Sequence, residues 1–374
     1  MNFILLTQYD GKIVGPIAKL LGVLMDGLFK MLSGIGIPNI GLAIFLFTIV
    51  VNIILLPLTI NQQKNMKLNQ ALAPELSRIQ AKYKGKRDQA SLEKQQRETQ
   101  MLQEKYGYNP TSGCLPLLIQ MPILFALYRV IYQIPGYVTA IKDQFQIIAE
   151  AALKQDGFVT KIADLASSNM VTDATNFDGS TVESVNHIID LLYKFDSSEW
   201  AQFKSLFPNI ADTITEPLAR INEYNSFLFG IQLNEAPGYK LTIALIIPFL
   251  AWFTQWLSMK VTSGAQPTNP DDPTAQAMKS MNTFMPLFSA FICITLPAGL
   301  GVYWVASAVV RTVIQVFINK RFEKISNEDI IAESVAEEYA AYGITSDPNS
   351  LYETTTMIQR GDMLEKEKKE LVNS

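Results

Sequence analysis

The sequence predicts an all-α polytopic membrane protein with five transmembrane helices and a helical hairpin in the cytoplasm. Three observations support this fold class. The 374 residues are 48% hydrophobic and 18% charged, which is too apolar for two ordinary soluble domains. Several apolar runs reach the ~20 residues that a helix needs to cross a bilayer. The connecting segments also differ sharply in charge, which indicates that they lie on opposite sides of a membrane.

The apolar runs predict five spans. Two runs, at residues 40–59 and 241–259, carry no charged residue. A third contains only Arg129, and a run of twice the span length at residues 281–319 contains only Arg311. The motif "LPAGLG" interrupts this long run, so two helices joined by a tight turn are expected. The five predicted spans are residues 40–60, 111–134, 239–260, 280–297 and 299–319.

Charge predicts how these spans are oriented. Residues 61–110 contain ten Lys and Arg against five Asp and Glu, whereas residues 135–240 contain seven against fourteen. Because basic loops stay in the cytoplasm, the connection at residues 61–110 is expected there. Alternation of the spans then places residues 1–39 and an acidic insert at 135–238 outside, and a loop at 261–279 and the tail at 320–374 inside.

The segment before the first span is expected to be an amphipathic helix that lies in the outer membrane interface. In "GPIAKLLGVLMDGLFKMLSGIG" apolar residues recur at helical spacing, but Lys19, Asp26 and Lys30 interrupt them. A cleavable signal sequence is the alternative. A compact basic start and an uninterrupted apolar core, which such a signal needs, are missing.

Residues 61–110 are predicted to form a polar helical hairpin. Two charge-laced helical patterns are separated near "KYKGKRD", and Pro110 ends the second. A solvated connector that only sets the topology is the alternative, although connectors of this length seldom contain so little Gly, Ser and Pro. We expect the hairpin to matter for function, and removal of residues 67–105 to leave a folded protein.

The acidic insert, at about residues 136–224, reads as several short amphipathic helices. Examples are "VESVNHIIDLLYKF" and "EWAQFKSLFPNIADTI", joined by Ser-, Thr- and Asp-rich segments. A small helical cap on the outer side and a docking site for an extracellular partner are both open. The sequence assigns no function to this insert.

The spans lack the side chains of enzyme active sites. None contains Asp, Glu or His, and the single histidine, His187, lies outside all of them. These absences argue against an intramembrane protease, and no catalytic residue, metal site or cofactor is predicted. Cys114 and Cys293 both fall within spans, where they are expected to be small buried apolar residues.

Three blocks of sequence carry a resemblance to a known family. They are "LLPLT" at the end of the first span, "NPTSGCLPLLIQMPILFALYRVIY" in the second, and "MNTFMPLFSAFICITLPAGLGVYWVASAVVRTVIQ" in the last two. Together they resemble the YidC family of membrane protein insertases. The second block is the most specific, because hydropathy alone does not produce two prolines around a glutamine within a span. The resemblance covers about residues 16–134 and 225–321.

The resemblance implies a non-enzymatic protein in which the five transmembrane helices surround a hydrophilic groove. Through this groove, hydrophobic segments of newly made proteins pass from the cytosol into the bilayer. Nascent membrane proteins are then the partners, with the ribosome and the Sec translocation channel as possible further partners and no specific nucleic acid. A small-solute transporter or channel is the alternative, because Pro-broken spans and polar linings also occur there.

The groove of this family carries an arginine five residues before the proline of "LLPLT", and this position is Asn52 here. An amide offers hydrogen bonds to a substrate but no net charge. Arg311 lies nine residues before Lys320, roughly 13 Å along a helix, and Asn52 lies seven residues before Thr59, roughly 10 Å. Their depths from the cytoplasmic side therefore nearly match, and Arg311 is a candidate to replace the missing charge.

A polar stripe supports this assignment. Tyr303, Ser307, Arg311 and Gln315 recur every fourth residue, on one face of the last span. A charge within a span normally points into a cavity, because facing lipid costs about 2.5–3.5 kcal/mol. As alternatives, Arg311 extends to the cytosolic headgroups and Asn52 bonds a neighbouring helix. The predicted groove residues are Asn52, Gln120, Gln255, Tyr303, Trp304, Ser307 and Arg311.

Overall fold

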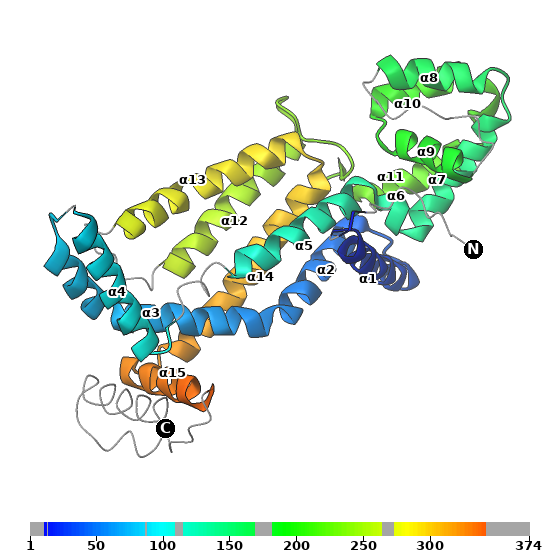
Figure 1. Ribbon diagram of the computed structural model, residues 1–374. Coiled ribbons are helices and arrows are strands. Elements are labelled where there is room, and N and C mark those ends of the chain that lie inside the picture. Colours follow the sequence, from blue (N-terminus) through cyan, green and yellow to red (C-terminus); the bar gives the residue numbers. More distant parts are fainter. Residues whose placement is uncertain are drawn as a thin grey trace. The chain divides into compact units, whose positions relative to one another are not determined.

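The computed structural model describes residues 11–12, 14–86, 88–108, 115–168, 182–263 and 273–341 (Figure 1). These residues are helical except for short connections and one two-stranded sheet. The chain forms two compact units. Unit 1 comprises Met1–Ile53, Ile119–Lys260 and Ala277–Arg311, and unit 2 comprises Ile54–Leu118, Val261–Gln276 and Thr312–Ser374.

Apolar helices occur at the positions of all five predicted spans. They are α2 (Ile40–Ile54), α5 (Leu115–Tyr132), α12 (Ile246–Ser263), α13 (Pro273–Thr295) and α14 (Ala298–Phe322). Among the described residues, Ile243–Thr262 and Ala298–Phe322 are each long and apolar enough to cross a membrane. A third crossing is present if α2 and α3 (Leu56–Tyr83) count together as one broken span. The number of five spans stays a prediction.

The first predicted span is interrupted. Helix α2 ends at Ile54, and α3 begins at Leu56 with Pro57 in its first turn. Proline has no backbone N–H and its ring clashes with the preceding turn, so a helix readily breaks just before it. Beyond this break α3 continues without interruption into the predicted hairpin.

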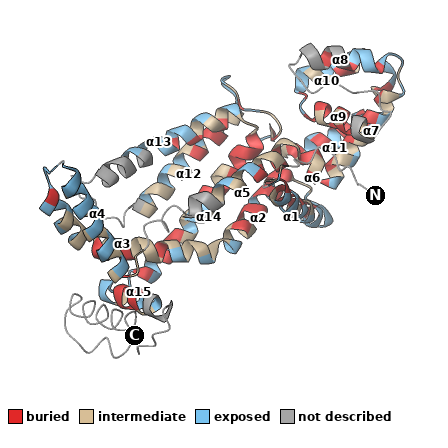
Figure 2. Ribbon diagram, in the orientation of Figure 1, coloured by how far each residue is buried: buried red, intermediate tan, exposed pale blue. Residues whose placement is uncertain are grey.

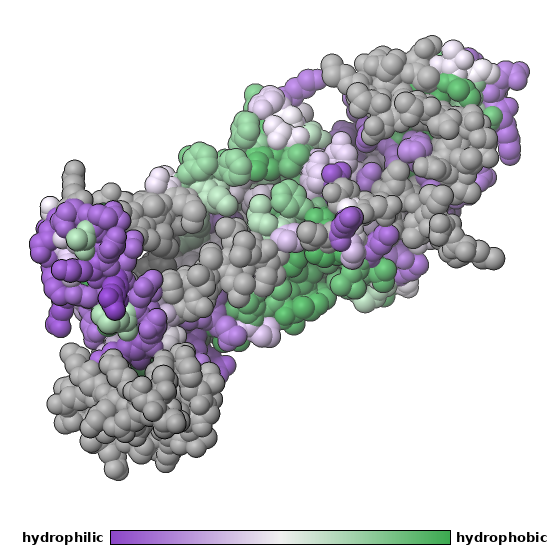
Figure 3. Space-filling model, viewed as in Figure 1, coloured by the Kyte–Doolittle hydropathy of each residue, from purple (hydrophilic) through white to green (hydrophobic). Residues whose placement is uncertain are grey.

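The span helices of unit 1 present large apolar side chains to their surroundings. Exposed examples are Phe45 on α2, Phe125 on α5, Phe249 on α12 and Phe284 on α13. Figure 3 shows hydrophobic surface over these helices on the face that it presents. A soluble protein seldom exposes such patches, whereas lipid tails cover them without cost.

Two glycines at the start of α14 allow the helices of unit 1 to approach closely. A Cβ added at Gly301 would lie 2.5 Å from Cγ2 of Ile247 on α12. One added at Gly299 would lie 3.2 Å from Cγ2 of Ile131 on α5 and 3.5 Å from Cδ1 of Ile44 on α2. Small residues at such crossings are typical of membrane helices, which bind one another by close packing.

A small β-hairpin, which the sequence analysis did not predict, covers the turn between α13 and α14. Strand β1 (Ser226–Phe227) pairs antiparallel with β2 (Ile231–Gln232). The chain after β2 bonds the "LPAGLG" turn, because the Gly299 N–H donates to the Leu233 carbonyl at 2.9 Å and the Ala298 N–H to the Glu235 carbonyl at 2.8 Å. The hairpin therefore satisfies backbone groups at the start of α14.

The acidic insert forms a bundle of short helices. They are α6 (Ile134–Tyr137), α7 (Thr139–Leu153), α8 (Phe158–Ser168), α9 (Val182–Tyr193), α10 (Ser197–Leu206) and α11 (Thr215–Asn225). Buried residues occur on each of them (Figure 2). Trp200 and Phe203 of α10 pack edge to face and join Phe145, Phe195 and Phe207 in an aromatic core. Helix α10 ends before Pro208, so the predicted helical stretch at residues 199–214 is two pieces.

The amphipathic N-terminal segment forms α1 (Val14–Gly34) and packs on the insert. Leu21, Met25 and Phe29 are buried on one face, and Phe29 contacts the Tyr224 ring edge to face. The Thr139 N–H donates to Asp26 Oδ1 at 2.9 Å, which fixes α1 to the start of α7. The opposite face is also apolar and stays exposed, with Leu20, Val23 and Met31.

The insert contains a carboxyl group that makes its stability depend on pH. Burial raises the pKa of Asp190 on α9 to about 7, although nearby Lys194 opposes the shift. The native state therefore binds this proton more tightly than the unfolded state, whose pKa is near 3.8. The stabilisation that protonated Asp190 contributes is therefore nearly complete at pH 4, decreases as the pH rises, and is lost above pH 7.

Asp190→Asn is therefore expected to stabilise the insert at pH 8, by at most about 4 kcal/mol, and to change it little at pH 4. Hydrogen exchange of α7 and α9 in the variant and the native protein, compared at each pH, measures the difference. Asp143→Asn, at an exposed position on α7, is the control. An equal effect of Asp190→Asn at both pH values would contradict the prediction.

Unit 2 is built around the polar hairpin. Helices α3 and α4 (Gln89–Lys105) pack together, and a turn at residues 84–85, within the predicted break, follows α3. Asp88 caps α4 by accepting from the Ser91 N–H at 3.0 Å. A third helix, α15 (Asn327–Ala341), packs on α3. The buried core of unit 2 comprises Leu68, Ala71, Leu72, Tyr106, Ile318, Phe322, Ile330, Ile331 and Val335.

Candidate functional site

The seven predicted groove residues all lie in unit 1, on four helices. Asn52 is on α2, Gln120 on α5 and Gln255 on α12, and the remaining four are on α14. Tyr303 and Ser307 are buried, Asn52, Gln120, Gln255 and Trp304 are half-buried, and Arg311 is exposed. The polar face of α14 therefore turns inward over its first half and becomes accessible at Arg311.

Arg311 folds back along its own helix. Its Nη2 donates to Ser307 Oγ at 2.8 Å, and its Nε donates to the Ser307 carbonyl at 3.3 Å. The guanidinium therefore lies one turn nearer the N-terminal end of α14 than the Arg311 backbone, as helix geometry favours. This direction leads away from the basic C-terminal end of the helix, at Lys320 and Arg321.

Tyr303 joins two of the helices. Gln120 Nε2 donates to Tyr303 Oη at 3.3 Å, which links α5 to α14. In the sequence Gln120 stands between two prolines, and α5 continues through Pro122 without a break. A glutamine that bonds a buried phenol lines the interior of the helix group and also holds two helices together.

The amide of Asn52 is used within its own helix. Its Nδ2 donates to the Thr48 carbonyl at 2.8 Å, and Thr48 is itself buried and donates to the Ile44 carbonyl at 2.7 Å. In the ranges that the structure describes, no hydrogen bond joins Asn52, Gln255 or Trp304 to the other predicted groove residues. Hydrogen bonds therefore join four of the seven predicted groove residues in two separate pairs, Gln120 with Tyr303 and Ser307 with Arg311.

The polar stripe of α14 continues as an amide network in unit 2. The buried Gln315 donates through Nε2 to Gln63 Oε1 at 2.9 Å and to Asn319 Oδ1 at 2.7 Å. Asn319 Nδ2 donates to the Val261 carbonyl at 3.2 Å. The sequence analysis included Gln315 in the stripe but missed Gln63 and Asn319. The spacing of four from Gln315 to Asn319 was the available signal for the second of these.

Reactive and metal-binding side chains are sparse here. Over the described ranges, no three His, Cys, Asp or Glu residues lie close enough to hold a metal ion. Cys293 on α13 is buried, as predicted, whereas Cys114 lies outside the described residues. The functional groups of the site are thus amides, hydroxyls and one guanidinium.

Apolar helices with lipid-facing side chains and a polar inner stripe define a helical multi-pass membrane protein. Residues 31–325, more than half of the chain, match the sequence model of the 60Kd inner membrane protein family, and the chain belongs to this family. It is 27% identical over 313 residues to the membrane protein insertase YidC of Bifidobacterium longum, covering 82% of this chain and 76% of the relative.

Two further matches agree with this assignment. The chain is 50% identical over 93 residues to the membrane protein insertase YidC 2 of Bacillus anthracis, covering 25% of this chain and 36% of that protein. It is 28% identical over 303 residues to the chloroplastic ALBINO3-like protein 1 of Arabidopsis thaliana, covering 80% of this chain and 46% of the relative. The chain thus spans less than half the length of these two relatives.

Proposed function

We propose that the protein is a membrane protein insertase that passes hydrophobic segments of newly made proteins from the cytosol into the bilayer. Its substrates are nascent membrane proteins, and insertion requires no covalent chemistry. The observation that carries the proposal, together with family membership, is the polar stripe of α14, which is buried at Tyr303 and Ser307 and accessible at Arg311. A stripe of this kind in an apolar helix is costly unless it faces water or protein.

The groove that receives the substrate is formed by α2, α5, α12 and α14. Asn52, Gln120 and Gln255 supply hydrogen-bond donors and acceptors, and Tyr303 and Trp304 offer apolar surface along which a segment slides. Arg311 supplies the positive charge, because its guanidinium turns toward Ser307 rather than toward the C-terminal end of α14. Where water is sparse, this charge attracts an acidic segment more strongly than it would in bulk solvent.

The orientation follows from charge. The basic hairpin and the tail lie in the cytoplasm, and residues 1–39 and the acidic insert lie outside. The exposed apolar face of α1, with Leu20, Val23 and Met31, lies in the outer membrane interface, while its opposite face packs on the insert.

The ribosome and the Sec translocation channel are further partners of the cytoplasmic side. From Lys320 onward the tail contains seven Lys and Arg against twelve Asp and Glu. An acidic segment is repelled by RNA phosphates, so the tail contributes at most weak ribosome binding. The basic hairpin is the better candidate for such contacts.

Reconstitution tests the proposed function. Purified protein in liposomes is expected to promote insertion of a small single-span substrate, measured by protease protection, at a rate well above that of protein-free liposomes. The same vesicles, loaded with a panel of small solutes, measure transport. Solute movement without insertion would support a transporter and contradict the proposal.

A further inference from the structure

We infer that α15 is a positioning helix that holds the base of the cytoplasmic hairpin against the end of α14, and that insertion depends on this contact. The inference deepens the proposed function and rests on it. It is carried by three sets of contacts within unit 2: a shared apolar core, a charged and hydrogen-bonded face, and a lysine that binds the end of α14.

The apolar core joins residues of four helices, two from the hairpin and two from the C-terminal part of the chain. Ile330, Ile331 and Val335 of α15 are buried together with Leu68 and Leu72 of α3. The same core contains Ile318 and Phe322 of α14 and Tyr106 at the end of α4. Helix α15 therefore completes the core that holds α3, α4 and the end of α14 together.

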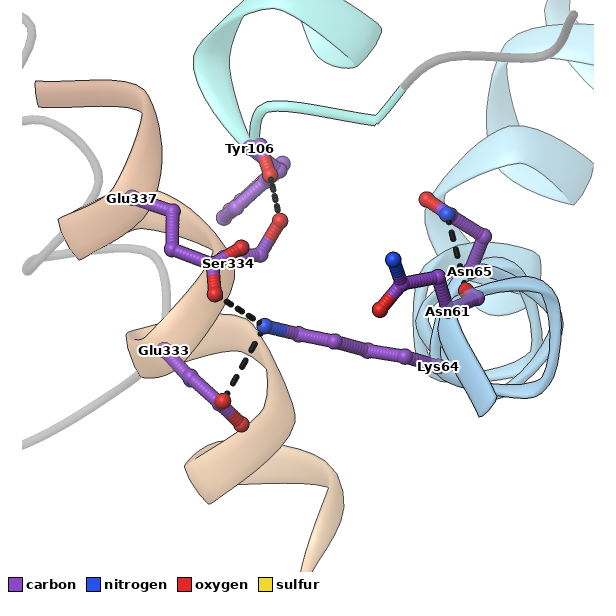
Figure 4. A network of polar contacts seen from close by, with 7 residues as sticks. All are labelled: Asn61, Lys64, Asn65, Tyr106, Glu333, Ser334 and Glu337. Atoms are coloured by element: carbon purple, nitrogen blue, oxygen red, sulfur yellow. Dashed lines mark hydrogen bonds and ion pairs between the residues drawn. The ribbon is translucent and has the colours of Figure 1, made fainter. Parts of the chain in front are cut away.

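The charged face of α15 binds both helices of the hairpin (Figure 4). Lys64 Nζ of α3 lies 3.1 Å from Glu333 Oε1 and 2.7 Å from Glu337 Oε1. Ser334 Oγ, between the two glutamates, donates to the Tyr106 carbonyl at 3.0 Å, where α4 ends. One turn of α15 therefore fixes the start of the hairpin through Lys64 and its end through Tyr106.

A second lysine connects α3 to α14. The Lys67 ammonium, one turn after Lys64, donates to the carbonyls of Phe322 and Ile325. These carbonyls lie at and just beyond the end of α14, where helix carbonyls lack partners and carry partial negative charge. Burial lowers the pKa of Lys67, and Asp329 and Glu323 oppose the shift.

The short connection between α14 and α15 is also well defined. The Asp329 N–H donates to Ser326 Oγ at 3.0 Å, and the Ser326 N–H donates to Asp329 Oδ2 at 3.2 Å. These two reciprocal hydrogen bonds cap the start of α15, and only four residues separate the end of α14 from that start. Since α15 cannot move far from α14, whatever α15 binds is held near the end of α14.

The contact is selective because its charges are complementary. The α15 sequence contains Glu and Asp but no Lys or Arg, and it covers the face of α3 that carries Lys64 and Lys67. The side chains of Glu333 and Glu337 are 55% and 67% exposed, so lysines at these positions stay in solvent, while Lys64, which is 18% exposed, loses both of its partners. These positions therefore allow the contact to be broken with the core left intact.

The experiment compares three full-length proteins in lipid vesicles: native, Glu333→Lys/Glu337→Lys, and the same double variant with Lys64→Glu. In the double variant we expect amides at the base of α3 and in α15 to exchange hydrogen at least tenfold faster, and the insertion rate to fall at least threefold. The triple variant restores opposite charges, so its hydrogen-exchange rate and its insertion rate are both expected to return most of the way to the native values. Glu216→Lys, which breaks an exposed pair with Arg220 in unit 1, is the matched control and should change neither.

Each outcome is decisive. If the amides of α3 and α15 in the double variant exchange hydrogen at the native rate, the charged contact does not position α15. Faster exchange with unimpaired insertion, or failure of the triple variant to recover, would overturn the link between hairpin position and insertion. Failure of the native protein to insert any substrate would instead reject the proposed function, while the exchange data would still test the contact.

Discussion

Arg311→Ala is expected to lower the insertion rate of substrates with acidic outer segments by roughly tenfold, which corresponds to ~1.4 kcal/mol of lost attraction. The guanidinium is the only net charge among the seven proposed groove residues, and its hydrogen bonds to Ser307 hold it along the polar stripe. Without it, an acidic segment entering a region of low dielectric meets only amides and hydroxyls. Substrates with neutral outer segments should insert at nearly the native rate.

Four further variants sharpen this test. Arg311→Lys keeps the charge and should retain much of the activity. Ser307→Ala removes one hydrogen bond to the guanidinium and should cause a smaller loss than Arg311→Ala. Asn52→Arg in the Arg311→Ala background should recover insertion, because it returns a positive charge to similar depth on α2. Arg129→Ala, on α5 and outside the proposed groove, is the control for loss of an arginine from a predicted span. Normal insertion of acidic substrates by Arg311→Ala would exclude a relocated groove charge.

The helical class of this protein was predictable because it depends on periodicity and composition, which are local properties. Runs without charge located α2 and α12, a longer run with a single arginine located α13 and α14, and the "LPAGLG" interruption located the turn between these last two helices. The break at Leu55 was not predicted, although Pro57 was visible. Pro74, Pro122 and Pro286 all lie inside continuous helices, so proline alone does not decide where a helix ends.

The β-hairpin at residues 226–232 was missed for a different reason. Its strands are two residues each, too short for an alternating pattern, and Leu228 and Phe229 adopt positive φ angles that such residues rarely adopt, so Gly230 was the one signal for a turn. Its position is fixed by bonds to the α13–α14 turn, which is more than sixty residues away in sequence. Contacts of this range are not encoded in a local pattern.

The candidate site was partly predictable. The spacing of four residues placed Tyr303, Ser307 and Gln315 on one face of α14, and all three are buried. The contacts of Gln63, Lys64 and Lys67 were not predictable, because these residues read as part of a solvated polar helix. Their partners lie on α14 and α15, about 250 residues further along the chain.

These contacts at the base of the hairpin bear on one expectation from the sequence. Sequence alone suggested that residues 67–105 could be removed without loss of the fold. The structure argues against this expectation, because that deletion would remove Leu68 and Leu72 from the core of unit 2, together with the hydrogen bonds from Lys67 to the end of α14. The separable part is the distal half of the hairpin, beyond Leu76 on α3 and before Leu102 on α4, since both of these residues pack against the core.

Replacing residues 77–101 by a short Gly-Ser linker is therefore expected to leave a folded protein that inserts substrates at least fivefold more slowly. The removed segment contains seven Lys and Arg against three Asp and Glu, so it is the part of the hairpin with the largest excess of basic residues to offer to acidic partners. The core of unit 2 and the contacts of α15 are retained, so α15 should exchange hydrogen as in the native protein and the unfolding midpoint should change little.

A second variant keeps the full length of both helices but changes Lys84, Lys86 and Arg87 to Gln, which separates the effect of charge from the effect of length. If the shortened protein inserts substrates at the native rate, the distal hairpin is only a connector between α2 and α5, and the basic surface has no part in receiving substrates.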